Sequence, residues 1–113
     1  THYGMSKAGQ IAVARGLAES LGGTGITVNS VVPGPTRSRG MEDFLSELAA
    51  KEGKAQADIK QDFFVKTRPN SLLGRFIRTE EVADMVVFLA SPRSAATTGA
   101  VLRVEGGLLK GAF

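Results

Sequence analysis

The chain has 113 residues, of which 42% are hydrophobic and 22% charged, a balance typical of one soluble globular domain. It contains no cysteine, which excludes disulfides and thiolate ligands, and we expect no metal site. No apolar stretch reaches the roughly 18 residues that a membrane helix needs, and no signal-peptide pattern is visible. We therefore expect a cytoplasmic protein without a membrane partner.

The formal net charge of +3 raises the question of a nucleic-acid partner. The basic residues are dispersed, however. Arg37 and Arg39 lie close together, as do Arg75 and Arg78, but there is no basic run that would follow a phosphate backbone. Aromatic residues make up only 6% of the chain, few for a base-stacking surface. We therefore expect no nucleic-acid binding.

The first predicted element is a helix over residues 6–21, where apolar side chains recur at helical spacing. Gly22 and Gly23 are expected to adopt the left-handed conformation that ends a helix. Residues 26–32 are β-branched and almost continuously apolar, which predicts a strand buried on both faces of a parallel sheet. That strand should end at Pro33-Gly34-Pro35, because proline cannot continue a ladder.

The segment from Thr36 to Arg78 is long for a connection. It leaves the carboxyl end of the predicted strand, where open α/β sheets bind their ligands. Helices are predicted over residues 41–51 and 57–65. Two interpretations remain open, a lid over a ligand site or a surface insertion of two packed helices.

A second helix–strand unit follows this segment. Thr79 is a suitable N-cap, Glu80 and Glu81 complement the helix dipole, and Ser91-Pro92 ends the helix. Residues 100–104 then predict a short strand. The order helix, strand, helix, strand is typical of an α/β layered fold.

Two parallel strands do not close a core, because each buried strand needs neighbours on its edges. We therefore expect further strands, supplied by missing N-terminal sequence or by another polypeptide, and interpret the chain as a fragment.

Tyr3 and Lys7 are four positions apart, so a helix places them on one face with Cβ atoms roughly 6 Å apart. A nearby ammonium stabilises a phenolate, which lets a tyrosine act as an acid or base. The alternative is a solvated helix start with no chemistry. Functional groups so near the first residue also indicate that upstream sequence is missing.

Four motifs stand in order along the chain. They are Tyr3-Gly4-Met5-Ser6-Lys7, residues 26–36, Leu73-Gly74-Arg75-Phe76 before Thr79-Glu80-Glu81-Val82-Ala83, and Thr98-Gly99 through Val104-Glu105-Gly106-Gly107. Together they resemble the C-terminal half of a short-chain dehydrogenase/reductase over essentially the whole chain. The resemblance implies a Rossmann-like, doubly wound parallel sheet with helices on both faces. Residues 1–113 would be the C-terminal part of one dinucleotide-binding oxidoreductase domain, and residues 37–78 its substrate-binding lid.

The same resemblance implies roles for individual residues. Tyr3 would be the catalytic acid/base, and Lys7 its helper, which also binds the nicotinamide ribose. Glu105 stands where the family more often has aspartate, which we interpret as a structural variation. The residues implied to bind the cofactor are Tyr3, Lys7, Pro33, Gly34, Thr36 (through its backbone) and Ser38 (through its hydroxyl).

The implied function is hydride transfer between NAD or NADP and a small alcohol or carbonyl substrate. The implied partners are the missing N-terminal half and further copies of the chain, in a dimer or more specifically a homotetramer. The fragment alone is expected to be inactive. A non-catalytic dinucleotide-binding or scaffold protein of the same fold is the alternative.

Overall fold

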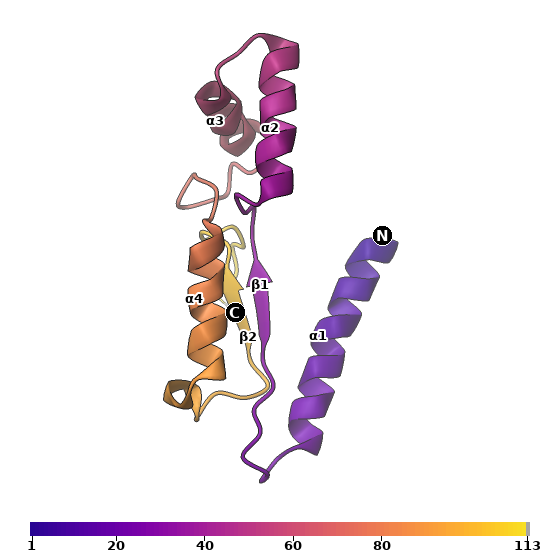
Figure 1. Cartoon of the computed structure of the whole chain (residues 1–113). Helices are drawn as coiled ribbons and strands as arrows, with labels where there is room; N and C mark the ends of the chain where they lie inside the picture. The colour runs from indigo at the N-terminus through magenta and orange to yellow at the C-terminus, as the bar shows by residue number, and fades with distance from the viewer. Residues whose placement is uncertain (113) are drawn as a thin grey trace. The chain divides into compact units, whose positions relative to one another are not determined.

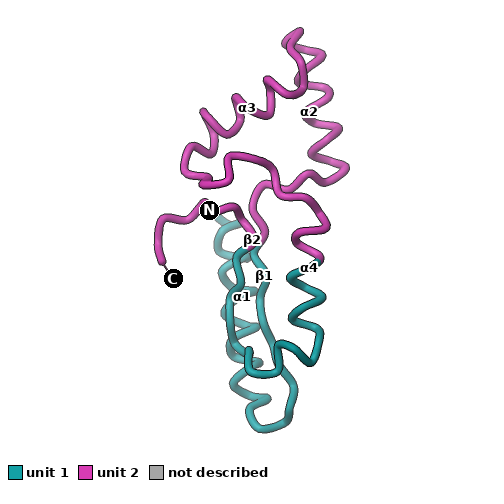
Figure 2. Tube along the Cα trace, turned by 90° about the vertical axis from the view of Figure 1, so that its left-hand side faces the viewer, with its two compact units in different colours: residues 1–32, 84–103 teal, residues 33–83, 104–113 magenta. Residues whose placement is uncertain are grey.

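The computed structural model describes residues 1–112; residue 113, the last of the predicted domain, lies outside the described residues. The elements in chain order are α1 (His2–Ser20), β1 (Ser30–Pro33), α2 (Arg39–Glu52), α3 (Gln56–Lys66), α4 (Thr79–Ala90), η1 (Pro92–Ser94) and β2 (Val101–Val104) (Figure 1). They form two compact units (Figure 2). Unit 1 holds residues 1–32 and 84–103, and unit 2 holds residues 33–83 and the chain from 104 onward.

β1 and β2 pair in a two-stranded sheet. The Ser30 N–H donates to the Ala100 carbonyl (2.9 Å), and the Gly34 N–H donates to the Val104 carbonyl (2.9 Å). The bonds advance in the same direction along both strands, so the pairing is parallel. In unit 1, α1 and the second half of α4 lie on opposite sides of the strands (Figure 1). The prediction of an α/β fold with parallel strands and helices on both faces is confirmed.

β1 begins four residues later than the strand predicted from residue 26. Side chains hold the chain before it, together with one backbone bond from the Gly99 N–H to the Val28 carbonyl (2.7 Å). Asn29 donates from Nδ2 to the Thr97 carbonyl (3.0 Å) and accepts at Oδ1 from the Ala100 N–H (3.1 Å). The Val28 N–H donates to Thr98 Oγ1 (3.1 Å). These bonds hold residues 28 and 29 to residues 97–100 without a regular ladder.

The end of α1 also differs in detail from the prediction. Leu21 is the C-cap, and the positive φ angles fall at Gly23 (80°) and Gly25 (79°) rather than at Gly22. The two left-handed glycines reverse the chain toward β1, since such φ angles are unfavourable for residues with a Cβ. Apolar side chains on α1 remain largely exposed, among them Met5 and Val13 at 70% each.

Unit 2 has a hydrophobic core of its own. Its buried members are Leu45, Ile59, Phe64 and Phe76. The rings of Phe64 and Phe76 meet edge to face at 4.9 Å between centroids, a favoured aromatic arrangement. α2 and α3 therefore pack as a helical hairpin, in agreement with the two helices predicted between residues 36 and 78.

A short parallel pairing joins the two ends of this hairpin segment. The Ile77 N–H donates to the Pro35 carbonyl (2.9 Å), and the Arg37 N–H donates to the Ile77 carbonyl (2.8 Å). Residues 38–76 thus leave and return at one point in unit 2. The two ends of the segment that contains the hairpin are therefore hydrogen-bonded to each other.

An ion pair fixes the chain just beyond this point. Arg75 donates from both terminal nitrogens to the Glu81 carboxylate (2.8 and 2.9 Å), a bidentate contact. The Arg78 N–H donates to the same carboxylate (2.9 Å). The hydrogen bond from Arg75, followed by that from Arg78, lowers the pKa of Glu81 from an ordinary 4.5 to about 2.

Acid should therefore destabilise the fold through Glu81. A carboxyl group with a lowered pKa stabilises the folded state above its unfolded pKa, and this contribution is lost as the pH falls from 4.5 toward 2. We expect Glu81→Gln to flatten the pH dependence of urea stability in that window. Glu80→Gln is the matched control, since Glu80 lies in the same helical turn. An equal flattening by both variants would contradict the assignment.

Candidate active site

Tyr3 and Lys7 both lie on α1. The Lys7 Nζ lies 5.6 Å from the centroid of the Tyr3 ring, so the two side chains share one face of the helix, as their spacing predicts. The ammonium sits over the ring, in a cation–π contact. Tyr3 is 69% exposed, which leaves its phenol accessible to a ligand. The pair can thus present a proton donor with a positive charge beside it.

The turn after β1 requires glycine at position 34. A Cβ built on Gly34 would lie 2.8 Å from Glu105 Cα, closer than real Cβ contacts allow. Glu105 is itself held in place, because its carboxylate accepts from the N–H groups of Gly107 (3.1 Å) and Leu109 (2.8 Å). The Pro33-Gly34 turn therefore rests on a fixed backbone. The longer glutamate serves here as a local cap, which agrees with a structural role.

Thr36 carries an unused backbone donor. The pairing of Pro35 and Arg37 with Ile77 directs the Thr36 N–H to the other side of the chain. Within residues 1–112 that N–H has no hydrogen-bond partner. The Thr36 hydroxyl donates to the Gly34 carbonyl (2.8 Å), which stiffens the turn. The site thus offers one oriented N–H donor.

Ser38 has a structural task that the sequence analysis did not assign to it. It is the N-cap of α2, and its Oγ accepts from the Met41 N–H (3.3 Å). Because the cap uses Oγ only as an acceptor, the hydroxyl proton remains able to donate. One atom can therefore start the helix and hold a ligand.

The structure gathers the predicted site residues into two groups. Tyr3 and Lys7 belong to unit 1, and Pro33, Gly34, Thr36 and Ser38 belong to unit 2. Within residues 1–112 no cluster of His, Asp and Glu side chains has a geometry suited to a metal ion. None of the described helices is both long and apolar enough to cross a bilayer.

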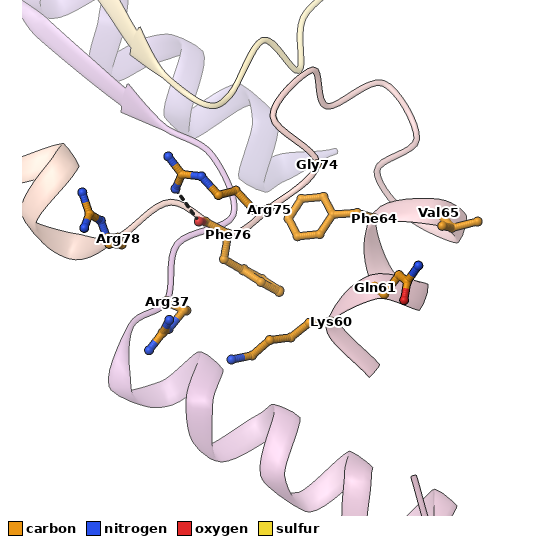
Figure 3. Close-up of a pocket in the computed structure, with 9 residues that line it drawn as sticks. All are labelled: Arg37, Lys60, Gln61, Phe64, Val65, Gly74, Arg75, Phe76 and Arg78. Atoms are coloured by element: carbon orange, nitrogen blue, oxygen red, sulfur yellow. Dashed lines mark hydrogen bonds between the residues drawn. The ribbon is translucent and has the colours of Figure 1, made fainter. Parts of the chain in front are cut away.

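The sequence did not predict that four basic residues line a common pocket. Arg37, Lys60, Arg75 and Arg78 line one pocket in unit 2 (Figure 3). Arg75 and Arg78 lie close together in the sequence, but Arg37 and Lys60 are far from them and from each other. Only the pairing of residue 77 with residues 35 and 37 could have indicated that the arginines around them are neighbours.

The comparisons with known proteins identify the family. A family model described as enoyl-(acyl carrier protein) reductase matches residues 1–109. The chain belongs to the short-chain dehydrogenase/reductase family. The prediction drawn from the four ordered motifs is confirmed at this level.

Two curated relatives show how much of the family's sequence the chain spans. It is 42% identical to the uncharacterized oxidoreductase YvaG of Bacillus subtilis (strain 168), covering 99% of this chain and 42% of the relative. It is 36% identical to the 3-oxoacyl-[acyl-carrier-protein] reductase FabG of Thermotoga maritima, covering 96% of this chain and 38% of the relative. The chain thus spans about two fifths of the length of these relatives.

A solved structure gives the corresponding result for the fold. The chain superposes on L-sorbose reductase from Gluconobacter frateurii, complexed with NADPH and L-sorbose, with a TM-score of 0.85. The two are 28% identical, and the match covers 96% of this chain and 40% of the reductase. The arrangement of helices and strands is therefore that of a short-chain dehydrogenase/reductase.

The contact between Gly34 and Glu105 can be tested by adding one methyl group. We expect Gly34→Ala to destabilise the protein by about 1–3 kcal/mol, because the Cβ must push fixed backbone aside. Gly40→Ala is the control. Gly40 lies in α2 with nothing within 4 Å of its Cβ position, so the substitution should stabilise the helix by about 0.5–1 kcal/mol. Urea unfolding measures both, and similar effects would contradict the assignment.

Proposed function

We propose that this chain contributes the acid/base and nicotinamide-contacting part of an NAD- or NADP-dependent oxidoreductase that interconverts small alcohols and carbonyl compounds. The observation that carries the proposal is the Tyr3–Lys7 pair on one face of α1. Family membership and the NADPH complex of the sorbose reductase support it. The same reasoning favours an enzyme over a non-catalytic scaffold, which would have no need for the pair.

The chemistry requires one proton and one hydride for each carbonyl reduced. NAD(P)H supplies the hydride when it is bound. The Tyr3 phenol donates its proton to the carbonyl oxygen as negative charge develops there, and in the reverse direction the phenolate accepts the alcohol proton. Lys7 stabilises the phenolate electrostatically, since its ammonium lies beside the ring.

The turn after β1 has donors suited to a nicotinamide cofactor. The Thr36 N–H is unpaired within the described chain, and the Ser38 hydroxyl retains a proton to donate. A carboxamide oxygen accepts hydrogen bonds of this kind. Pro33 and Gly34 hold these donors in a turn that packs closely against the backbone of Glu105. We assign the carboxamide to Thr36 and an adjacent cofactor oxygen to Ser38.

Activity is proposed to need more protein than residues 1–112. The sheet has two strands, and α1 leaves apolar side chains such as Val13 (70% exposed) in contact with water. Further strands would cover them. The relatives are more than twice as long, which agrees with this proposal. We also propose residues 37–78 as the substrate-binding lid, and a cytoplasmic homo-oligomer, a dimer or tetramer, as the working assembly.

The role of Tyr3 is tested by Tyr3→Phe in the intact protein. Loss of the phenolic proton should lower kcat by about 10²–10⁴-fold, while nicotinamide binding stays within a few-fold of the original. Stopped-flow turnover and fluorescence titration of the cofactor measure the two quantities. His2→Gln on the same helix is the control and should leave turnover unchanged. Near-normal turnover of the phenylalanine variant would refute the assignment.

The two tasks of Ser38 can be separated by a pair of variants. Ser38→Ala and Ser38→Gly both remove the hydroxyl, so each should weaken cofactor binding by about 2- to 10-fold. They differ in the cap: alanine should cost about 1 kcal/mol of stability and glycine only a few tenths. Cofactor binding that follows stability instead of the hydroxyl would restrict Ser38 to a structural role.

A further inference from the structure

The basic pocket of unit 2 is lined by cationic side chains on one side and by apolar side chains on the other. It has a volume of about 810 Å³ and lies among the residues before α2, the helix α3 and the segment before α4. The cationic ends of Arg37, Arg78 and Lys60 lie toward one side of it (Figure 3). Phe64 and Val65 lie toward the other. Charged and apolar ends of this kind suit an amphiphilic small molecule.

Glu42 neutralises only part of the charge on the cationic side. Its Oε1 contacts Arg37 Nε (2.6 Å) and Lys60 Nζ (3.5 Å), so one carboxylate serves two cations. Burial works to raise the pKa of Glu42, but the charges of Lys60 and Arg37 outweigh it and the pKa is lowered. Arg37 is 53% exposed, and its terminal nitrogens donate no hydrogen bond to residues 1–112.

Arg75 and Arg78 share Glu81 unequally. Arg75 uses its terminal nitrogens within the protein. Both of them donate to Glu81, and one also donates to the Phe76 carbonyl (3.1 Å). Arg78 reaches Glu81 through Nε (3.4 Å) and is 66% exposed. Its terminal nitrogens donate no hydrogen bond to residues 1–112, so they can donate to a ligand. Four cations against two carboxylates leave the pocket with two positive charges.

We propose that the basic pocket binds a small molecule in which a phosphate monoester is joined to an apolar or aromatic group. The terminal nitrogens of Arg37 and Arg78 hold the phosphate, since guanidinium groups donate paired hydrogen bonds to its oxygens. A dianion matches the two surplus charges, whereas a carboxylate leaves one uncompensated. Phe64 and Phe76 form the apolar wall. This site lies within unit 2, and its occupation does not depend on hydride transfer.

The phosphate has two possible sources with the same chemistry. It belongs either to the reacting substrate or to a separate molecule that regulates the lid. Binding and turnover measurements distinguish them.

Binding is measured by calorimetric titration of the intact protein with phenyl phosphate, inorganic phosphate and phenol. Phenyl phosphate should bind saturably, about tenfold or more tighter than inorganic phosphate, because only it fills both ends of the pocket. Phenol should show no binding. Absence of saturable binding by phenyl phosphate overturns the proposal, and equal affinity for inorganic phosphate overturns its apolar part.

Three matched variants locate the binding. Arg37→Gln and Arg78→Gln should each weaken phenyl phosphate binding about tenfold, since each removes a charge-assisted hydrogen bond. Arg39→Gln removes the same charge from α2 but not from the pocket lining, and should change affinity less than twofold. Equal losses in all three variants would indicate general electrostatic attraction and overturn the site. Circular dichroism verifies that each variant is folded.

Turnover then assigns the source. 4-Formylphenyl phosphate and 4-hydroxybenzaldehyde are compared as carbonyl substrates in the Arg78→Gln variant. A raised KM for the phosphorylated aldehyde alone identifies the phosphate as part of the substrate. A regulator is indicated where phenyl phosphate changes turnover of 4-hydroxybenzaldehyde without competing with it. The calorimetric titration measures binding without turnover, so it tests the anion site independently of the proposed hydride transfer.

Discussion

The hydrogen bonds of Ile77 to Pro35 and Arg37 close the helical hairpin on itself. Without them, the ends of residues 38–76 would not be held together. The packing of α2 against α3 would then have to offset the whole loss of conformational entropy on ordering this long segment. With them, the ends are held at one point and the aromatic core of the hairpin can form locally. The same bonds orient the Thr36 N–H and bring arginines from both ends of the segment to one pocket. The proposed cofactor contacts and the proposed anion site therefore share one structural origin.

Sequence reasoning succeeded where the signal is local. Helical periodicity predicted α2 and α3 to within a few residues, and the spacing of Tyr3 and Lys7 predicted their common face, because a helix repeats the same geometry over four positions. The family was recognised from ordered motifs, since no single motif is specific enough. The acid/base role proposed for Tyr3 comes from that resemblance.

The misses have a common physical cause, which is hydrogen bonding between residues far apart in the sequence. The late start of β1 depends on Asn29 bonding to Thr97 and Ala100, about 70 positions away. β-branched residues before it indicated a strand, but propensity yields to such tertiary bonds. The basic pocket was missed for the same reason. Its cations come from three separate parts of the sequence, and a long-range backbone pairing places Arg37 near Arg75 and Arg78.

The proposed double use of Ser38 Oγ, as the cap of α2 and as a donor to the cofactor, would constrain which residue can stand at this position. An aspartate would cap α2 equally well but could not donate, and an alanine could do neither, so only a hydroxyl serves both tasks through a single atom. A ligand that accepts a hydrogen bond from the Ser38 hydroxyl also holds the N-cap residue of α2 in place. By mass action, ligand occupancy and the stability of the first turn of the hairpin then rise together. Under this proposal, the cofactor concentration would set how stably the first turn of α2, in the proposed substrate-binding lid, is folded.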